Sequence, residues 1–196
     1  MFQVRIHGRG GQGVVTAAEL LAVAAFREGR HAQAFPSFGS ERTGAPVVSY
    51  CRIDDREIRT REPINAPDAV VIQDVTLIHQ VDLFSGLEES GYVLINTSRT
   101  FTELGLGELV ERCRPDHLMT CPATELALEH VGRPVPNAAL LGGFAALTGQ
   151  VPIHAIGDAL RDRFGPTIGE RNLAAATAAF DHVRAQMEVV SGAAAD

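Results

Sequence analysis

The first thirteen residues constrain the fold of this chain more than any other stretch. Apolar and polar residues alternate from Phe2 to His7, which is typical of a strand with one buried face. The glycine-rich run Gly8-Arg9-Gly10-Gly11-Gln12-Gly13 follows at once, and the alanine- and leucine-rich stretch from Val14 to Phe26 predicts a helix. The glycines fit the G-x-G-x-x-G spacing of a turn that lets the backbone approach a ligand closely. A helix that begins at such a turn offers unpaired N–H groups to an anion such as a phosphate.

Two interpretations of this turn remain open. A dinucleotide-binding turn is normally followed, about 20 residues later, by an acidic residue at the tip of the second strand, which holds a ribose. Here the second strand, His31 to Phe35, runs into Pro36 and a polar loop, with no acid at the tip. The turn therefore either serves a nicotinamide or flavin dinucleotide without this acid, or is needed only to pack the helix on the strand.

Length and charge exclude several classes of function. The 196 residues suit one α/β domain, which we expect to cover residues 1–190, followed by a frayed tail at 191–196. A net charge of −7 argues against non-specific binding to nucleic acid. A strand at Phe2 leaves no room for a signal peptide, and the longest glycine-free apolar run, Leu20 to Phe26, is too short to span a bilayer. We therefore expect a cytoplasmic protein.

Strand and helix patterns alternate along the rest of the chain. We expect further strands at Pro46–Ile53, Ala69–Gln73, Tyr92–Ile95 and Leu118–Cys121, and a short returning arm at Arg56–Thr60. We expect helices at Leu77–Glu89, Ala123–Val131, Ala138–Thr148 (capped by Asn137), Ile153–Phe164 and Glu170–Val190. This alternation predicts an α/β fold: a three-layer Rossmann-like domain with a mostly parallel central sheet and helices on both faces. In such folds, ligands bind beyond the carboxyl ends of the strands.

The loop after the second strand is the other informative stretch. It consists of Ser37, Phe38, Gly39, Ser40, Glu41, Arg42, Thr43 and Gly44, and it is too polar for the core. The guanidinium of Arg42 can bind a phosphate or carboxylate through two hydrogen bonds, and the hydroxyls of Ser40 and Thr43 can donate. The alternative is a surface loop that carries an exposed Glu41–Arg42 ion pair.

Other polar residues suggest binding rather than catalysis. Asp74 and Asn96 follow predicted strands, where each could either contact a ligand or cap the next turn. His7 at the first strand tip suits a structural role better than an anion contact. We identify no nucleophile, no general base and no metal-ligand spacing. The three cysteines, Cys51, Cys113 and Cys121, form no C-x-x-C pair, and we expect no iron–sulfur cluster on this chain.

Three of these stretches together resemble a known family. The residues from Gly8 to Ala22 are similar to the opening of the gamma subunit, or gamma domain, of 2-oxoacid:acceptor (ferredoxin-type) oxidoreductases. The loop from Pro36 to Val47 resembles the second signature of that family, and Asn137 to Phe144 resembles the third. The similarity extends from Phe2 to about Met187. The Gly-Gly-Gln-Gly turn is specific only in combination with the second loop.

The resemblance implies a function that the residues alone do not show. These enzymes convert a 2-oxoacid, coenzyme A and an oxidised acceptor to acyl-CoA, carbon dioxide and a reduced acceptor. It implies that this chain is the gamma subunit and contributes coenzyme A binding and assembly. Thiamine diphosphate and [4Fe-4S] clusters are expected on partner subunits of the alpha, beta and delta (ferredoxin-like) types. The alternative is a free-standing dinucleotide-binding oxidoreductase.

We expect the ligand contacts to come from the glycine turn, the second loop and one strand end, and the resemblance makes coenzyme A the expected ligand. The expected contacts are Gly8, Arg9, Gly10, Gly11, Gln12, Gly13, Ser37, Phe38, Gly39, Ser40, Glu41, Arg42, Thr43 and Asn96. Ser40 and Thr43 depart from the residues that pyruvate enzymes more often have there, so the sequence does not identify the 2-oxoacid. Pyruvate, 2-oxoglutarate, branched-chain, indolepyruvate and aryl-glyoxylate enzymes share this type of subunit.

Overall fold

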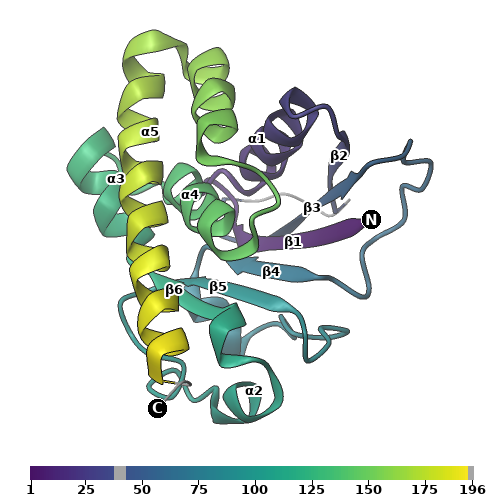
Figure 1. The fold of residues 1–196 in the computed structure, drawn as a ribbon, viewed down its shortest axis with the longest axis vertical. Helices are drawn as coiled ribbons and strands as arrows, with labels where there is room; N and C mark the ends of the chain where they lie inside the picture. Colours follow the sequence, from purple (N-terminus) through teal and green to yellow (C-terminus); the bar gives the residue numbers. More distant parts are fainter. Residues whose placement is uncertain (38–42, 194–196) are drawn as a thin grey trace.

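A six-stranded sheet forms the centre of the molecule, shown in Figure 1. The computed structural model describes residues 1–37 and 43–193. The strand order is β2-β3-β1-β4-β5-β6. The strands are β1 (Phe2–Arg9), β2 (His31–Pro36), β3 (Pro46–Asp54), β4 (Ala69–Ile72), β5 (Tyr92–Asn96) and β6 (Leu118–Cys121). Strands β1, β4, β5 and β6 run parallel, whereas β3 is antiparallel to both of its neighbours. The predicted mostly parallel sheet is therefore confirmed.

The order of the strands indicates where a ligand would bind. From β1 the chain goes through α1 (Val14–Arg27) to β2 and β3 on one side, and then crosses to β4 on the other side of β1. The carboxyl ends of β1 and β4 therefore form a topological switch point, where α/β proteins bind ligands. The glycine turn follows β1 directly, so it lies at this point.

Three helices cover one face of the sheet. They are α1, α4 (Asn137–Thr148) and α5 (Ile153–Ala193), and α3 (Ala123–Val131) packs against α5 (Figure 1). The main core lies between these helices and the sheet and includes Ile6, Leu21 and Phe144, none more than 1% exposed. None of the helices that the structure describes is long and apolar enough to cross a membrane.

The helix α5 is bent into two pieces. Gly165 has φ 77° and ψ 171°, outside the helical region, and Pro166 follows it. The second piece folds back on the first, because Gly169 lies against the backbone of Arg161. The predicted break at Gly165-Pro166 is confirmed, but the second piece begins about four residues earlier than Glu170.

The opposite face of the sheet has a thinner cover than the sequence predicts. A helix was expected at Leu77–Glu89, but the chain forms only the 3-10 turn η1 (Val75–His79), followed by irregular turns. The buried Arg5 explains this, since its guanidinium donates to the carbonyl oxygens of Leu83 and Ser85 at 2.8 and 2.7 Å. Those carbonyls are the acceptors that a continuing helix would need.

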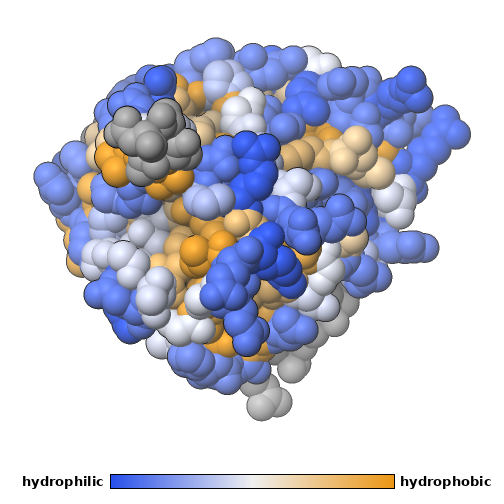
Figure 2. All heavy atoms as spheres, turned by 60° about the horizontal axis from the view of Figure 1, so that its bottom comes forward, coloured by the Kyte–Doolittle hydropathy of each residue, from blue (hydrophilic) through white to orange (hydrophobic). Residues whose placement is uncertain are grey.

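A second apolar cluster fills this layer. It joins residues of β4 and β5 to η1, the turns around Leu83 and Leu87, and the short helix α2 (Gly107–Arg112). Several of its hydrophobic side chains are only half-buried: Val75, Ile78, Phe84, Leu106 and Val110. Seen from the side of α2, the surface has apolar areas bordered by polar side chains (Figure 2).

The predicted strand at Arg56–Thr60 is wrong. This segment is irregular, and the carbonyl of Thr60 at its end accepts from a side chain rather than from a strand. The guanidinium of Arg52, on β3, donates to the carbonyl oxygens of Glu62 at 2.6 Å and Thr60 at 3.5 Å. An arginine on the sheet therefore fixes the connection to β4.

Candidate anion-binding site

The glycines of the turn have different reasons to be glycine. A Cβ on Gly8 would lie 2.7 Å from Val14 Cγ2, so Gly8 allows α1 to pack closely on β1. Gly11 has φ +95° with open space around it, so only its backbone conformation requires glycine. Gly13 has φ +73°, and a Cβ there would lie 2.6 Å from Asn137 Nδ2. In the β1–α1 turn, Gly11 and Gly13 are therefore required by their positive φ angles. Gly8 and Gly13 are required because side chains of other residues lie too close for a Cβ.

The glycine turn and the second loop lie side by side. Gly10 forms an isolated parallel bridge with Thr43. The N–H of Gly10 donates to the carbonyl of Ala45 at 2.9 Å, and the N–H of Gly44 donates to the carbonyl of Gly10 at 3.0 Å. At the other end of the loop, the N–H of Ser37 donates to the carbonyl of Val48. Phe38, Gly39, Ser40, Glu41 and Arg42 lie outside the described residues.

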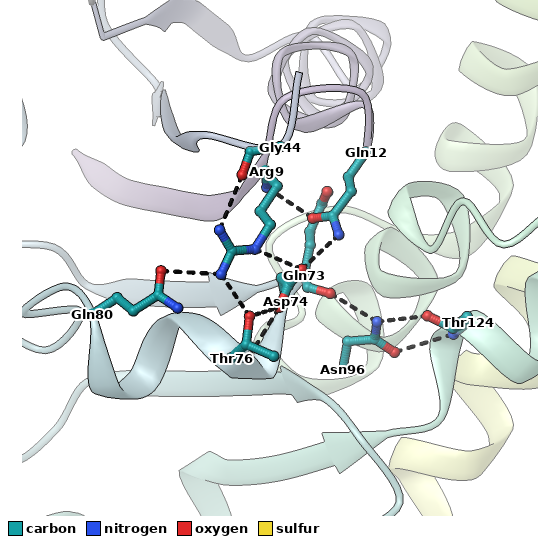
Figure 3. Close-up of polar contacts among 9 residues, drawn as sticks. All are labelled: Arg9, Gln12, Gly44, Gln73, Asp74, Thr76, Gln80, Asn96 and Thr124. Atoms are coloured by element: carbon teal, nitrogen blue, oxygen red, sulfur yellow. Dashed lines mark hydrogen bonds and ion pairs between the residues drawn. The ribbon is translucent and has the colours of Figure 1, made fainter. Parts of the chain in front are cut away.

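The guanidinium of Arg9 points towards Asp74, Thr76 and Gln80 (Figure 3). Its Nε lies 3.2 Å from Asp74 Oδ2, and its Nη2 donates to Thr76 Oγ1 at 2.7 Å and Gln80 Oε1 at 3.1 Å. A further hydrogen bond, of 3.0 Å, reaches the carbonyl of Gly44 in the second loop. Arg9 therefore joins the β1–α1 turn to the second loop and to η1.

Gln12 closes the same network. Its Oε1 accepts from the N–H of Arg9 at 2.8 Å, and its Nε2 donates to Asp74 Oδ2 at 2.8 Å. Burial raises the pKa of Asp74, but hydrogen bonds from Thr76 and Gln12 and the charge of Arg9 together hold that pKa below its usual range. The carboxylate is therefore ionised at neutral pH and fixes the turn. We define Arg9, Gln12, Asp74, Thr76 and Gln80 as the Arg9 clamp.

Asn96 also makes internal hydrogen bonds. Its Nδ2 donates to the carbonyl of Gln73 and to Thr124 Oγ1, both at 2.8 Å. Its Oδ1 accepts from the N–H of Thr124 at 3.1 Å. The side chain thus ties the end of β4 to the start of α3 (Figure 3), and its amide is occupied by these bonds. Of the two roles left open by the sequence, this geometry favours capping.

The start of α1 presents its main chain to a hollow. The first-turn N–H groups of Val14, Val15 and Thr16 precede the first helical hydrogen bond, which runs from Ala17 N to Gly13 O. Within residues 1–37 and 43–193, no side chain accepts from these N–H groups, and the first turn has no acidic residue. Alongside it lies a hollow of about 320 Å³, lined by Arg9, Gly10, Gly11, Gly13, Val14, Val15, Thr16 and Val47. Uncapped N–H groups and the positive end of the helix dipole suit an anion.

Among the described residues, His7 and two buried cysteines of the sheet are poorly suited to acid–base chemistry at neutral pH. Burial, and then the charge of Arg5, lower the pKa of His7 to about 4, so His7 is neutral at pH 7. Its Nε2 is buried without a hydrogen-bond partner in the described part of the chain. Burial raises the pKa of the Cys51 and Cys121 thiols to about 12, so both stay protonated. Within residues 1–37 and 43–193, no three His, Cys, Asp or Glu side chains are grouped to hold a metal ion.

Three residues near the turn were not among the ligand contacts expected from the sequence. Thr76 and Gln80 hold the guanidinium of Arg9, and Asn137 approaches Gly13 from α4. A signal for Thr76 exists in the sequence, because an Asp two residues earlier predicts an Asx turn, which the N–H of Thr76 completes at 3.0 Å. Gln80 and Asn137 reach the site only through tertiary packing.

The dinucleotide alternative still lacks its acidic residue. Strand β2 ends at Pro36 and is followed by Ser37, so no carboxylate lies at the strand tip to hold a ribose.

Comparisons with known proteins agree with the resemblance. The model of the family described as pyruvate ferredoxin/flavodoxin oxidoreductase matches residues 3–182. The common gamma subunit of the pyruvate and ketoisovalerate oxidoreductases of Thermococcus litoralis is 46% identical over 181 residues, which are 92% of this chain and 96% of that protein.

Solved structures show the same fold. The pyruvate oxidoreductase subunit PORC of Thermotoga maritima superposes with a TM-score of 0.78 and 34% identity, covering 92% of this chain and 95% of that one. A 2-oxoglutarate:ferredoxin oxidoreductase from Magnetococcus marinus shares the fold alone, with a TM-score of 0.67 at 19% identity, over 96% of this chain and 31% of that one. The family match covers most of the chain, and both PORC and the Thermococcus subunit align over nearly their full lengths. The chain therefore belongs to the pyruvate ferredoxin/flavodoxin oxidoreductase family, as a gamma-type subunit of a 2-oxoacid oxidoreductase.

Proposed function

We propose that this chain provides the phosphate-binding surface for coenzyme A in a 2-oxoacid:acceptor oxidoreductase. The observation that carries the proposal is the uncapped start of α1 beside a hollow, with the second loop bonded alongside it. Coenzyme A carries a diphosphate and a 3′-phosphate, and its reaction product is an acyl-CoA. The structure of the Magnetococcus enzyme, which shares this fold, is described with coenzyme A and succinyl-CoA bound.

The main chain makes the contacts in this proposal. Arg9, Gln12 and Asn96 are occupied by internal hydrogen bonds, so they hold the turn rather than the ligand. The donors left to a phosphate are the N–H groups of Val14, Val15 and Thr16, with Gly10 and Gly11 allowing a close approach. The second loop, which includes Arg42, would complete the site from the side of Thr43.

Bond-making steps are assigned to partner subunits. We place thiamine diphosphate and [4Fe-4S] clusters on partners of the alpha, beta and delta types, which would supply carbanion and electron-transfer chemistry. The cysteines of this chain do not fit a cluster, because Cys51, Cys113 and Cys121 are all buried and belong to no group of three potential metal ligands in the described residues. What this chain does in the reaction is to bind and orient coenzyme A.

We infer further that this subunit does not select the 2-oxoacid. The relative from Thermococcus litoralis is named as common to two oxidoreductases, one for pyruvate and one for ketoisovalerate. A subunit that is shared by two enzymes with different substrates cannot distinguish those substrates by its own pocket. Recognition of the common cosubstrate is a role consistent with such sharing.

A pair of variants at Thr16 tests the proposal. Thr16 lines the hollow in the first turn of α1. Thr16→Glu puts a negative charge where the phosphate would lie, and acidic residues at a helix start do not destabilise the helix. Thr16→Gln has the same size without the charge and serves as the control. In the assembled oxidoreductase, we expect Thr16→Glu to raise the KM for coenzyme A at least about tenfold over Thr16→Gln, since a charged hydrogen bond contributes roughly 1.5–3 kcal/mol. Equal KM values for the two variants would refute the proposal.

A further inference from the structure

Asn137 approaches the start of α1 from the start of another helix. It is the first residue of α4, and Pro136, not Asn137, occupies the cap position that the sequence assigned to Asn137. The residue is only 5% exposed. Its Nδ2 lies 2.6 Å from the place where a Cβ on residue 13 would be. The amide therefore occupies the space that the side chain of an ordinary N-cap residue would enter.

The orientation of this amide is fixed by its oxygen. Asn137 Oδ1 accepts from the N–H of Ala138 at 2.8 Å. The NH2 group therefore points away from α4 and towards Gly13. Within residues 1–37 and 43–193, Nδ2 donates to no acceptor, although the residue is more than nine-tenths buried. Among the described residues, Nδ2 is not one of the fully buried atoms that lack a partner, so the NH2 group keeps some access to solvent and is available to an acceptor bound beside Gly13.

The other groups around Gly13 are donors too. The N–H groups of Val14, Val15 and Thr16 have no intrahelical acceptor, and no side chain of the described residues caps them. The first turns of both α1 and α4 lack acidic residues. Two helix starts thus meet at Gly13 with their positive dipole ends, and the side chain between them adds a further donor. Only an acceptor, and best an anion, satisfies such a set.

We propose that Asn137 Nδ2 donates to the phosphate oxygen of coenzyme A that binds at the start of α1. This inference rests on the proposed function, and it adds a side chain from α4 to a site otherwise made by main chain. It also gives Gly13 a functional reason to lack a Cβ, because any side chain there would displace the donor.

Asn137→Asp separates a binding role from a structural one. The aspartate is isosteric and still accepts from the N–H of Ala138, and its charge is favourable at the start of a helix. The variant should therefore be at least as stable as the wild type in thermal unfolding. Its carboxylate faces Gly13 in place of a donor, so it repels a phosphate and can itself accept from the free N–H groups of α1. A purely structural Asn137 would leave cosubstrate affinity unchanged by this substitution.

The measurement is the KM for coenzyme A in the oxidoreductase assembled with the variant chain. We expect Asn137→Asp to raise it roughly ten- to hundredfold, because a hydrogen bond to a charged group is lost and a repulsion is gained. The affinity for pantetheine, which lacks the phosphates, and the KM for the 2-oxoacid should match those of the wild type. Asn137→Ser, which keeps a hydroxyl donor on a shorter side chain, should give an intermediate KM and provides the test if the aspartate variant does not fold.

The outcomes distinguish this inference from the proposed function. A wild-type KM for coenzyme A in Asn137→Asp, with a raised KM in Thr16→Glu, would overturn the role of Asn137 alone. A wild-type KM in both variants would overturn the phosphate site as well. An equal loss of affinity for coenzyme A and pantetheine would also overturn the inference, because it would show a general distortion rather than a lost phosphate contact.

Discussion

Replacement of Gly13 by alanine is the most informative perturbation of stability, because the structure separates its two costs. The first is backbone strain, since an L-residue at φ +73° costs roughly 1–2 kcal/mol. The second is steric, since the new methyl would lie 2.6 Å from Asn137 Nδ2 and the amide would have to move. Overpacking of this kind costs about 1–3 kcal/mol. Alanine returns about 0.4–1 kcal/mol by restricting the unfolded chain.

Gly11→Ala is the matched control. It lies in the same turn at φ +95°, but no atom lies within 4 Å of its Cβ position. Gly11→Ala therefore has the same cost in backbone strain and the same gain from a restricted unfolded chain, but its new methyl group meets no other atom. We expect Gly13→Ala to be less stable than Gly11→Ala by about 1–3 kcal/mol.

Urea unfolding and thermal unfolding of the full chain measure this difference. A domain of this size changes its Tm by about 2–4 °C per kcal/mol, so the two variants should differ by roughly 2–12 °C. Adding Asn137→Ala to Gly13→Ala should recover part of the loss, whereas adding it to Gly11→Ala should not. If Gly13→Ala proved as stable as Gly11→Ala, the close approach of Asn137 to the turn would be wrong.

Three further predictions concern other parts of the fold. The free energy of unfolding should fall by up to about 3 kcal/mol from pH 6.5 to pH 4, because the unfolded state takes up a proton that His7, with its pKa lowered to about 4, does not. Urea titrations at several pH values should show a smaller fall in His7→Gln. Asp74→Asn should lose about 1–2 kcal/mol at pH 7 because the Arg9 clamp loses its charge, and this difference should shrink below about pH 4 as the wild-type carboxylate is protonated. An undiminished difference at low pH would contradict the role of that charge. Gly142→Ala should cost more than about 3 kcal/mol, because its Cβ would lie 1.9 Å from the carbonyl oxygen of Ala176, while Gly192→Ala, with open space around it, should be close to neutral.

The sequence predicted the elements whose signals are local. The alternation from Phe2 to His7, the glycines and the apolar stretch after them define β1, the turn and α1 without reference to the rest of the chain. Gly165-Pro166 likewise marks the bend in α5, since both residues act on their own backbone. The bridge between Gly10 and Thr43 shows that the glycine turn and the second loop, each of which follows a strand, lie side by side.

Features that depend on distant partners could not be predicted in this way. The expected helix at Leu77–Glu89 fails because Arg5, nearly 80 residues away, takes its carbonyl groups. Arg9 was expected to contact coenzyme A as part of the glycine turn, and nothing nearby in the sequence shows that it pairs with Asp74. Asn137 was assigned to a helix cap, and only the packing of α4 on α1 brings it to Gly13. Periodicity and motif spacing contain no information on such contacts.

The position of coenzyme A in a structure of the assembled oxidoreductase tests the central claim most directly. We predict a phosphate of coenzyme A within hydrogen-bonding distance, about 3 Å, of the main-chain nitrogens at the start of α1 and of Asn137 Nδ2. Coenzyme A bound with all its phosphates on other subunits, and with the β1–α1 turn facing only protein or solvent, would contradict it.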